Sequence, residues 1–264
     1  MKAIILAGGL GIGFEPLNQI IPNPLLPIAG KPIIEYQLES MQTLRKKGFI
    51  DCVYISTRLE YKSVFSKWKK CFHPKERIEI IAPNDKWNSI MPKLGAIGRI
   101  YYVVDQCNIE DDFLVIAGDN IFDSDLKDLH TYFTTKNKSV VAGFQISSID
   151  INKKAERYGI IQTDKDGKIV SFIEKPKVLV PPLSFVSTAC YIFNKEDKDH
   201  IRDYTKILLK SKSRTLENKL GHLIIYLIVK TDVYASLLGG SWFNVGTIEG
   251  YNEANLEYLQ IRKK

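Results

Sequence analysis

The stretch LAGGLGIGFEPLNQIIPNPLLPIAGKP, Leu6 to Pro32, directly follows a short apolar run and combines a glycine cluster with several prolines. Glycines at the end of a buried strand let a phosphate approach the backbone, and their N–H groups can bind it. Between Ala7 and Gly30, however, the sequence contains no lysine, arginine or histidine. The segment therefore has the glycines of a phosphate-binding loop without its cations.

Two common phosphate-binding motifs do not fit this loop. In a dinucleotide fingerprint counted from Gly9 and Gly11, the third glycine would fall on Phe14. In a Walker A loop, Gly8 and Gly13 have the right spacing, but Phe14 follows where a lysine is needed. The remaining alternatives are another kind of nucleotide loop and a tight strand-to-helix connection that binds no ligand.

The composition excludes several other classes of protein. The net charge is +7 over 264 residues, but the basic residues are scattered, which indicates a solvated surface rather than a nucleic-acid-binding face. The four cysteines form no CxxC pair, which fits a reducing cytoplasm better than a disulfide framework. No apolar run approaches the length of a membrane span, so we expect a cytoplasmic protein without membrane contact.

Apolar runs alternate with segments of helical period, which predicts an α/β fold with a doubly wound, mostly parallel sheet and helices on both faces. The predicted strands of the first half are Lys2–Leu6, Cys52–Ser56, Ile78–Ile81, Phe113–Ala117 and Val140–Ile146. The predicted helices there are Ile33–Lys47, Leu59–Lys70, Lys93–Val104 and Leu126–Lys136.

The rhythm changes after Asp150, where YGIIQTDKDGKIVSFIEKP predicts a β-hairpin about a DKDG turn. Further along, the pattern predicts strands at Ser187–Phe193 and Val233–Leu238, helices at Ile201–Lys210 and Leu216–Val229, and a terminal helix that Thr247 caps and that ends at Ile261. We expect one domain over residues 1–264, with a nucleotide-binding half (1–146) and a sugar-phosphate-binding half with the closing helix (147–264).

The first loop, AGDNIF (117–122), the hairpin with its EKP end, and GGSWFNVGTIEGYNEANLEYL (239–259) occur in this order along the chain. Together they resemble the signature of the sugar-1-phosphate nucleotidyltransferases, the pyrophosphorylases that make nucleotide sugars. The resemblance implies their fold and their reaction, in which a sugar 1-phosphate and a nucleoside triphosphate give a nucleotide sugar and pyrophosphate. By resemblance, Leu6, Gly8, Gly9 and Gly11 bind the nucleotide.

The other motifs imply a metal site and a sugar-phosphate site. By resemblance, Asp119 binds Mg²⁺, Glu174 holds sugar hydroxyls, Lys175 binds the sugar phosphate, and Gly159 lets the sugar lie against the backbone. A carboxylate at the end of a strand suits Mg²⁺, but an aspartate there can also cap a helix. Glu174 and Lys175 can equally form a surface ion pair, which contributes little to stability.

The chain departs from the family pattern where that pattern is charged. Gly13 stands at the position of the family arginine and Asn23 at that of the lysine, the two cations that by resemblance act on the triphosphate in catalysis. Ile12 replaces a threonine, and Asn244 replaces the second metal-binding aspartate. Ala82 stands where the base-binding glutamine is usual, so the sequence identifies neither the base nor the sugar.

These departures predict a pocket that binds a nucleoside triphosphate, a sugar phosphate or a sugar nucleotide but turns over poorly, with Mg²⁺ bound weakly or not at all. The expected role is a regulatory or ligand-binding paralogue, with an active paralogue or further copies of the chain as partners. Such a division of labour exists among relatives, including the large subunits of ADP-glucose pyrophosphorylases. The alternative is an active enzyme in which Lys31, Lys86 or Lys93 replaces the lost cations. The sequence leaves activity and oligomeric state undetermined.

Overall fold

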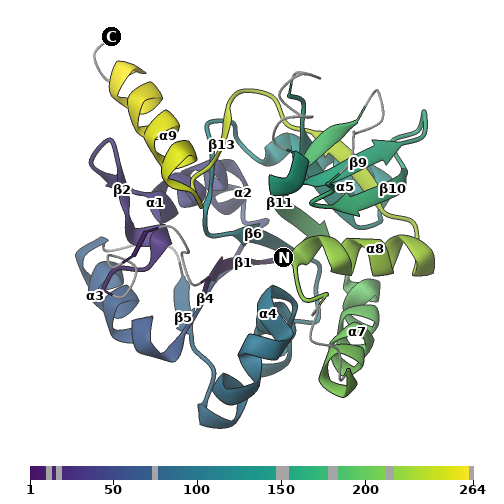
Figure 1. Cartoon of the computed structure of the whole chain (residues 1–264), viewed down its shortest axis with the longest axis horizontal. Coiled ribbons are helices and arrows are strands. Elements are labelled where there is room, and N and C mark those ends of the chain that lie inside the picture. The colour runs from purple at the N-terminus through teal and green to yellow at the C-terminus, as the bar shows by residue number, and fades with distance from the viewer. Residues whose placement is uncertain are drawn as a thin grey trace. The chain divides into compact units, whose positions relative to one another are not determined.

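The computed structural model describes residues 1–9, 14–15, 20–72, 77–146, 155–177, 184–211 and 217–261, and the chain divides into two compact units (Figure 1). The first unit comprises Met1–Asn88, Ile116–Lys127 and Gly240–Lys264. The second comprises Ser89–Val115 and Asp128–Gly239. Each unit therefore combines segments that are far apart in the sequence, and the expectation of a single domain stays a prediction.

The strand pairs of the first unit's main sheet whose register is known are parallel. Strand β4 (Cys52–Thr57) pairs with β1 (Lys2–Ala7) on one side and with β5 (Ile78–Ile81) on the other. The last two residues of β6 (Phe113–Ala117) belong to this unit, and β6 neighbours β1 in the order β6-β1-β4-β5. Every residue of β4 is buried, as expected for a strand covered on both faces. These strands confirm the predicted α/β class.

Helices of the first unit follow the predicted positions with shifted ends. They are α1 (Ile33–Ser40), α2 (Gln42–Lys46), η3 (Leu59–Tyr61), α3 (Lys62–Phe72) and α9 (Ile248–Ile261). The single helix predicted over Ile33–Lys47 is divided, because Met41 leaves the helical conformation between α1 and α2. Thr247 caps α9 as predicted, since its Oγ1 accepts a hydrogen bond from Gly250 N at 3.2 Å.

Two small sheets in the first unit escaped prediction. Strands β2 (Pro27–Ile28) and β3 (Lys31–Pro32) form a hairpin, and β7 (Asn120–Phe122) pairs with β13 (Trp242–Asn244). One core cluster contains residues from these small sheets, from α1 and α9, and from the residue after the short helix η2 (Asn23–Leu25). Its buried members are Leu26, Ile28, Ile33, Tyr36, Ile121, Val245 and Ala254. The proline-rich loop, the GDN segment and the closing segment therefore share one core.

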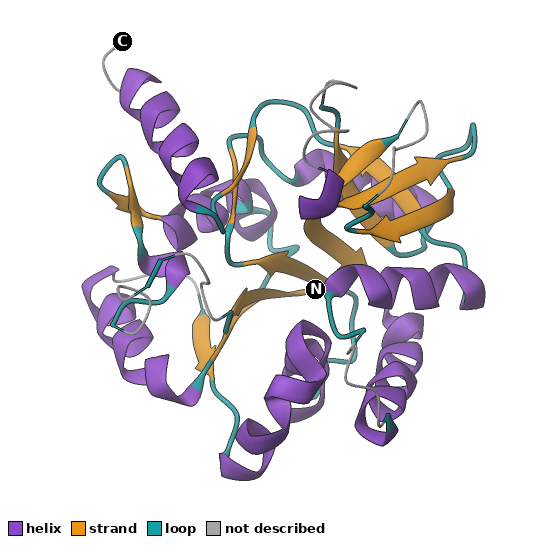
Figure 2. Ribbon diagram, viewed as in Figure 1, coloured by secondary structure: helices purple, strands orange, loops and turns teal. Residues whose placement is uncertain are grey.

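The second unit has a mixed sheet, with its strands drawn in orange in Figure 2. Its strands are β8 (Val140–Phe144), β9 (Gly159–Thr163), β10 (Ile169–Glu174), β11 (Phe185–Phe193) and β12 (Tyr234–Leu237), together with the first three residues of β6. Strands β9 and β10 are antiparallel, which confirms the predicted hairpin. Strand β11 pairs antiparallel with β8 and β9, whereas β12 runs parallel to β8.

Helices of the second unit are α4 (Asp85–Gln106, which begins in the first unit), α5 (Lys127–Lys136), α7 (Lys198–Lys210) and α8 (Leu220–Lys230), with short turns η4 (Ala155–Arg157) and η5 (Lys195–Asp197). Helix α4 begins earlier than predicted and is interrupted at Gly95, whose φ of 58° and ψ of −142° suit only glycine. The side chain of Asn218 donates to the carbonyl of Lys93 at 3.1 Å, so a residue outside the helix satisfies a carbonyl at the break.

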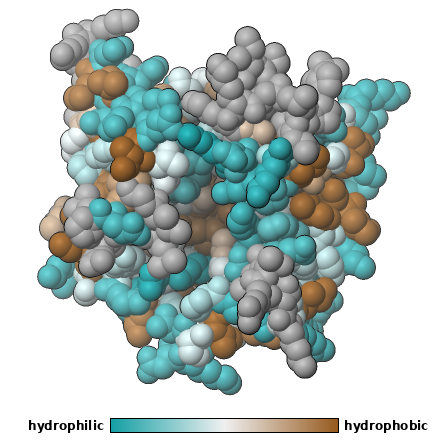
Figure 3. Space-filling model, viewed as in Figure 1, coloured by the Kyte–Doolittle hydropathy of each residue, from teal (hydrophilic) through white to brown (hydrophobic). Residues whose placement is uncertain are grey.

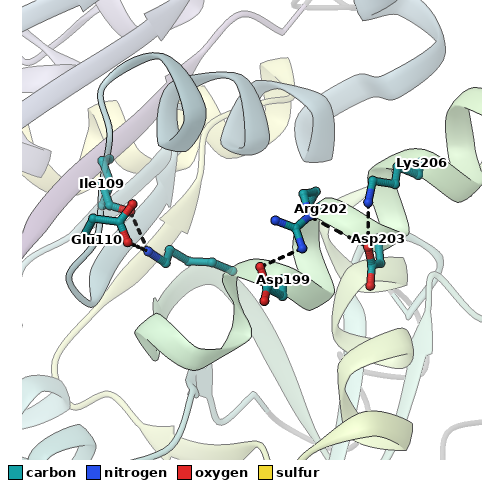
Figure 4. A network of polar contacts seen from close by, with 7 residues as sticks. Ile109, Glu110, Asp199, Arg202, Asp203 and Lys206 are labelled. Atoms are coloured by element: carbon teal, nitrogen blue, oxygen red, sulfur yellow. Dashed lines mark hydrogen bonds and ion pairs between the residues drawn. The ribbon is translucent and has the colours of Figure 1, made fainter.

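Charged side chains on α7 are largely paired with opposite charges (Figure 4). Arg202 lies 3.0 Å from Asp199, Lys206 lies 3.1 Å from Asp203, and Lys198 contacts Glu110 and the carbonyl of Ile109. Exposed pairs of this kind contribute little to stability, but they balance the positive charge locally. This balance agrees with the interpretation of the basic residues as a solvated surface.

The face drawn in Figure 3 is mostly hydrophilic, with apolar side chains in separate patches. In the first unit, exposed apolar side chains occur along α9, where Ile248, Leu256 and Leu259 are 55%, 63% and 42% exposed. Within the described residues, none of the helices combines the length and the apolar character needed to cross a bilayer.

Candidate functional site

The carboxyl end of β1 leads into the glycine loop. Leu6 and Gly8 are buried, whereas Gly9 is exposed, and a side chain at Gly9 would meet no other atom within 4 Å. The backbone at Gly9 is thus open to a ligand, as the loop prediction requires. Gly11 and Gly13, the other two loop glycines of the predicted site, lie outside the described residues.

A second glycine, Gly118, packs against the end of β1. A methyl group at Gly118 would lie 2.6 Å from the carbonyl oxygen of Leu6 and 2.7 Å from Cγ of Pro24. Gly118 N also donates a hydrogen bond to the Leu6 carbonyl at 3.0 Å. The glycine that precedes Asp119 is therefore needed for close contact between three segments of the first unit.

Asn23 begins the short helix η2 and is 8% exposed. Its Oδ1 is buried, and none of the described residues donates a hydrogen bond to it. At the position of the family lysine, the structure thus places a neutral amide that is enclosed and only partly satisfied. A buried acceptor without a donor costs about 1–3 kcal/mol, so this residue is not optimised for stability.

The lysines proposed to replace the lost cations are engaged elsewhere or exposed. Nζ of Lys31 lies 2.5 Å from Glu39 Oε2 and 3.7 Å from the centre of the Tyr36 ring. In the second unit, Nζ of Lys93 donates to the carbonyl of Leu209 at 2.6 Å. Lys86 is exposed at the start of α4. Lys31 and Lys93 therefore each have a partner among the described residues.

Asp119 and Asn244, predicted as metal ligands, lie next to each other. Asp119 occupies the turn between β6 and β7, and Asn244 is the register partner of Asn120 in the β7–β13 sheet. A methyl group at Gly246 would lie 2.6 Å from Asp119 Oδ2 and 3.1 Å from Asn244 Oδ1, so both oxygens border one small space. Because a strand follows Asp119, the alternative that it caps a helix does not apply.

An amide network holds the Asp119 side chain in place. Asn120 Nδ2 donates to Asp119 Oδ1 at 3.0 Å, and Asn120 Oδ1 accepts from Trp242 Nε1 at 2.7 Å. Gln37, which is fully buried in α1, donates to the carbonyls of Ala117 and Asn120 at 2.9 and 2.8 Å. The sequence assigned no role to Gln37, because other polar residues such as Glu35 and Glu39 also occur in α1 and no local pattern sets Gln37 apart.

The two oxygens fit Mg²⁺ as part of a site. Carboxylate and amide oxygens are the hard ligands that Mg²⁺ accepts, and it usually retains water and phosphate ligands besides one or two protein groups. Asn244 Oδ1 accepts one hydrogen bond, from Gly246 N at 3.0 Å, which leaves its second lone pair available. Among the described residues, no group of three or more His, Cys, Asp or Glu side chains forms a metal cluster.

In the second unit, Glu174 ends β10 and faces Gly159, its register partner at the start of β9. A methyl group at Gly159 would lie 3.3 Å from Glu174 Oε2 and 2.5 Å from Cζ of Phe172. The structure therefore brings Gly159 and Glu174 together, as the sugar-phosphate prediction requires. Glu174 is half-buried, and no described residue donates a hydrogen bond to its carboxylate or forms an ion pair with it.

Lys175 follows with an unusual backbone. Its φ of 52° places a non-glycine residue in the left-handed region, a conformation that costs energy and occurs often at functional sites. Its N–H donates to the Tyr158 carbonyl at 3.0 Å, which holds this conformation. The side chain is exposed and forms no ion pair with a described residue, so the structure does not support the alternative of a Glu174–Lys175 surface pair.

Residues 2–261 match the family model described as Nucleotidyl transferase. The chain belongs to the nucleotidyl transferase family. The resemblance to sugar-1-phosphate nucleotidyltransferases that the motifs indicated is thereby confirmed. The family model covers both units, including the GDN, EKP and closing segments.

Two curated relatives illustrate the range of the family. The chain is 29% identical over 259 residues to the bifunctional protein GlmU of Methanocaldococcus jannaschii, covering 98% of this chain and 54% of that protein. It is 28% identical over 275 residues to the glucose-1-phosphate adenylyltransferase of Mycoplasma mobile, covering 100% of this chain and 68% of that protein. The nucleotidyl transferase chain therefore spans between about half and two thirds of the length of these relatives.

A solved structure supports the fold. The crystal structure of UDP-glucose pyrophosphorylase complexed with UDP-glucose matches with a TM-score of 0.76 at 20% identity, covering 98% of each chain. At this identity the likeness establishes the nucleotidyltransferase fold and no more.

Base recognition, by contrast, lacks a clear signal in the structure. Ala82 follows β5 and is half-buried, and Asn84 Oδ1 accepts from Trp87 N at 3.1 Å in the first turn of α4. The residues after β5 thus lead directly into helix α4.

Proposed function

We propose that this nucleotidyl transferase family member binds a nucleotide or a sugar phosphate without efficient turnover and acts as a ligand-binding or regulatory paralogue. The observation that carries the proposal is Asn23, a buried neutral amide at the position where the family pattern has a catalytic lysine. The contacts of Lys31 with Glu39 and of Lys93 with the carbonyl of Leu209 support it, because each lysine already has a partner.

The reaction that the proposal concerns brings two anions together. An oxygen of the sugar 1-phosphate forms a bond to the α-phosphorus of a nucleoside triphosphate. The bond from that phosphorus to the oxygen bridging the α- and β-phosphates breaks, and pyrophosphate leaves with its electron pair. Catalysis of such a step consists mainly of positioning and of neutralising the charge that develops.

The chain retains groups for positioning. We propose that Gly8 and Gly9 receive the nucleotide, that Glu174 accepts hydrogen bonds from sugar hydroxyls, and that Lys175 binds the sugar phosphate. Asp119 and Asn244 would hold Mg²⁺, and when bound the ion would neutralise charge on the phosphates. Both units thus retain residues for ligand binding.

The chain lacks charged residues that the family pattern uses to neutralise charge during the reaction. Loss of one preorganised group that stabilises charge typically costs about 10²–10³ in rate. Gly13, Asn23 and Asn244 each replace a charged residue of the family pattern. Such losses are not additive, but a combined deficit of roughly 10⁴ or more is expected.

The alternative function is an active enzyme with rearranged cations. In the first unit the adjoining oxygens of Asp119 and Asn244 favour it, and in the second unit so do Glu174 and Lys175, which form no ion pair with a described residue. The two functions predict different amounts of pyrophosphate release and the same ligand binding.

The test is a pyrophosphate-release screen of the purified chain with Mg²⁺. It pairs each common nucleoside triphosphate with glucose 1-phosphate, mannose 1-phosphate and N-acetylglucosamine 1-phosphate. We expect ligand-dependent thermal stabilisation in at least one pairing, because a ligand that binds only the folded state raises its stability, but no release at an enzymatic rate. Rapid release by the unmodified chain would establish the alternative.

A charge-restoring variant tests whether the lost charges cause the proposed impairment of turnover. The triple variant Gly13→Arg, Asn23→Lys and Asn244→Asp should raise pyrophosphate release by two orders of magnitude or more, since each restored charge is worth about 10²–10³. A control with Gln42→Lys and Asn252→Asp adds charges at exposed positions and should leave the rate unchanged. A triple variant that folds and binds but stays inert would show that charge loss is not the defect.

A further inference from the structure

Helix α8 begins with a glycine that its helical position does not explain. Gly221 is the second residue of α8 and is buried. A glycine in a helix costs up to about 1 kcal/mol relative to alanine, so some other constraint must favour it. A methyl group at Gly221 would lie 2.0 Å from Oε2 of Glu174 and 2.7 Å from Cε1 of Phe172. Glu174 therefore occupies the space that any side chain at position 221 would fill.

Gly159 borders the same two side chains from another element. A methyl group there would lie 2.5 Å from Cζ of Phe172 and 3.3 Å from Glu174 Oε2. Two glycines, one on β9 and one on α8, thus flank the side chains of Phe172 and Glu174. We call this arrangement of Gly159, Phe172, Glu174 and Gly221 the carboxylate slot.

The slot holds the carboxylate by shape. No described residue donates a hydrogen bond to Glu174, although the carboxylate is half-buried and can accept several. Oε2 instead lies in the space that side chains at positions 159 and 221 would fill. A carboxylate held in this way still needs donors, and adjacent hydroxyl groups of a sugar can provide two hydrogen bonds to one carboxylate.

Strand β11 of the same unit carries a buried polar pair and an irregular backbone. The hydroxyl of Tyr191 lies 3.1 Å from Ser187 Oγ, and both residues are buried. Burial raises the pKa of Tyr191, and the negative charge of Glu174 raises it further. Between Ser187 and Tyr191 strand β11 bulges, with Ala189 at a φ of 54°. Bulges and left-handed residues of this kind are typical of places where a strand re-aims side chains.

We propose that Gly221 is a positioning residue that seats Glu174 to accept hydrogen bonds from the hydroxyl groups of a sugar phosphate. Gly221 acts through Glu174 and does not itself touch the ligand. The inference rests on the proposed function in one respect, that a sugar phosphate binds in the second unit. It is independent of whether the nucleotidyl transferase chain turns over.

The direct test measures dissociation constants by calorimetry for glucose 1-phosphate, mannose 1-phosphate and inorganic phosphate. In Gly221→Ala the methyl group displaces the carboxylate of Glu174, so the hydrogen bonds from the sugar hydroxyls to that carboxylate are lost. Because a hydrogen bond to a charged group contributes roughly a factor of ten or more in affinity, we expect the affinity for the two sugar phosphates to fall about tenfold or more. Affinity for inorganic phosphate should not change, because phosphate presents no sugar hydroxyl to Glu174.

The matched control is Gly239→Ala, also in the second unit. A methyl group at Gly239 meets no atom within 4 Å, so this variant should bind all three probes as the unmodified chain does. A rescue variant separates displacement of the carboxylate from general damage to α8. Glu174→Asp shortens the side chain, so adding Gly221→Ala to it should cost less than twofold in sugar-phosphate affinity.

A ligand-free measurement completes the test. The ¹³C carboxyl resonance of Glu174, assigned through Glu174→Gln, should shift in Gly221→Ala and stay in place in Gly239→Ala. An unmoved resonance, or unchanged sugar-phosphate affinity in Gly221→Ala, overturns the positioning role. Pyrophosphate release by the unmodified chain overturns the proposed impairment alone. A chain that binds no sugar phosphate at all overturns both the proposed ligand and its recognition by Glu174.

Discussion

The substitution Asn244→Asp should strengthen Mg²⁺ binding and lower the stability of the metal-free protein. Asp119 Oδ2 and Asn244 Oδ1 lie 2.6 and 3.1 Å from the same point above Gly246, which limits their separation to about 6 Å. An aspartate at 244 keeps the acceptor for Gly246 N, so the hydrogen bond at 3.0 Å survives and the change is mainly one of charge.

The separation determines the size of the effect. Two unit negative charges about 6 Å apart repel by about 0.7 kcal/mol in bulk water and about 3 kcal/mol at an effective dielectric constant of about 20. Without metal, Asn244→Asp should therefore unfold roughly 2–10 °C below the unmodified chain, at about 2–4 °C per kcal/mol for a protein near this size. Mg²⁺ at about 100 times the dissociation constant of the variant should offset most or all of this loss, since ligand at that level stabilises by about 2.7 kcal/mol, whereas the unmodified chain should gain less at the same concentration.

The assay is thermal unfolding in EDTA and in a series of Mg²⁺ concentrations. The control Asn252→Asp adds the same charge at an exposed position of α9 and should show neither effect. If Asn244→Asp is as stable as the unmodified chain in EDTA and gains no more from Mg²⁺, then positions 119 and 244 do not share an ion. That result would refute the magnesium site.

Three further outcomes follow from local structure. Gln37→Leu leaves two carbonyls without their side-chain donor and should lower the free energy of unfolding by about 2–4 kcal/mol, as urea titration would measure; a change below 1 kcal/mol would mean that water replaces the donor. Thr247→Ala removes the cap on Gly250 N and should cost about 1 kcal/mol in the same assay, with Thr247→Ser nearly neutral. Burial raises the pKa of Asp197 despite the hydrogen bond from Ser139, so its contribution to stability is greatest at low pH and is lost as the pH rises through its folded-state pKa. In urea titrations the stability of the unmodified chain relative to Asp197→Asn should therefore decline as the pH rises from below about 4, the ordinary pKa of an aspartate, through the raised folded-state pKa; a constant difference would contradict this assignment.

Local signals predicted the elements with the strongest sequence patterns. Ile78–Ile81 and Phe113–Ala117 are strands with the predicted bounds, because short runs rich in apolar residues are typical of buried strands. The hairpin about the DKDG turn and the cap at Thr247 were predicted for the same reason, since turn and cap chemistry acts over a few residues.

Elements that depend on distant partners escaped prediction. The three-residue strands β7 and β13 pair across more than 100 positions, and neither has enough residues for a periodic pattern. The break at Gly95 in α4 is accompanied by side-chain hydrogen bonds from Asn218, which lies far along the chain.

For the candidate site, the sequence by itself determined which chemical groups are present: the glycine loop without cations, the carboxylate at 119, the amides at 23 and 244, and the charges at 174 and 175. These are properties of residue types and spacing. Only the tertiary structure decided that Asp119 and Asn244 border one space, that Lys31 and Lys93 are engaged elsewhere, and that Gly221 leaves room for Glu174. Such contacts join residues far apart along the chain, and they form only when folding buries enough apolar surface to bring the segments together.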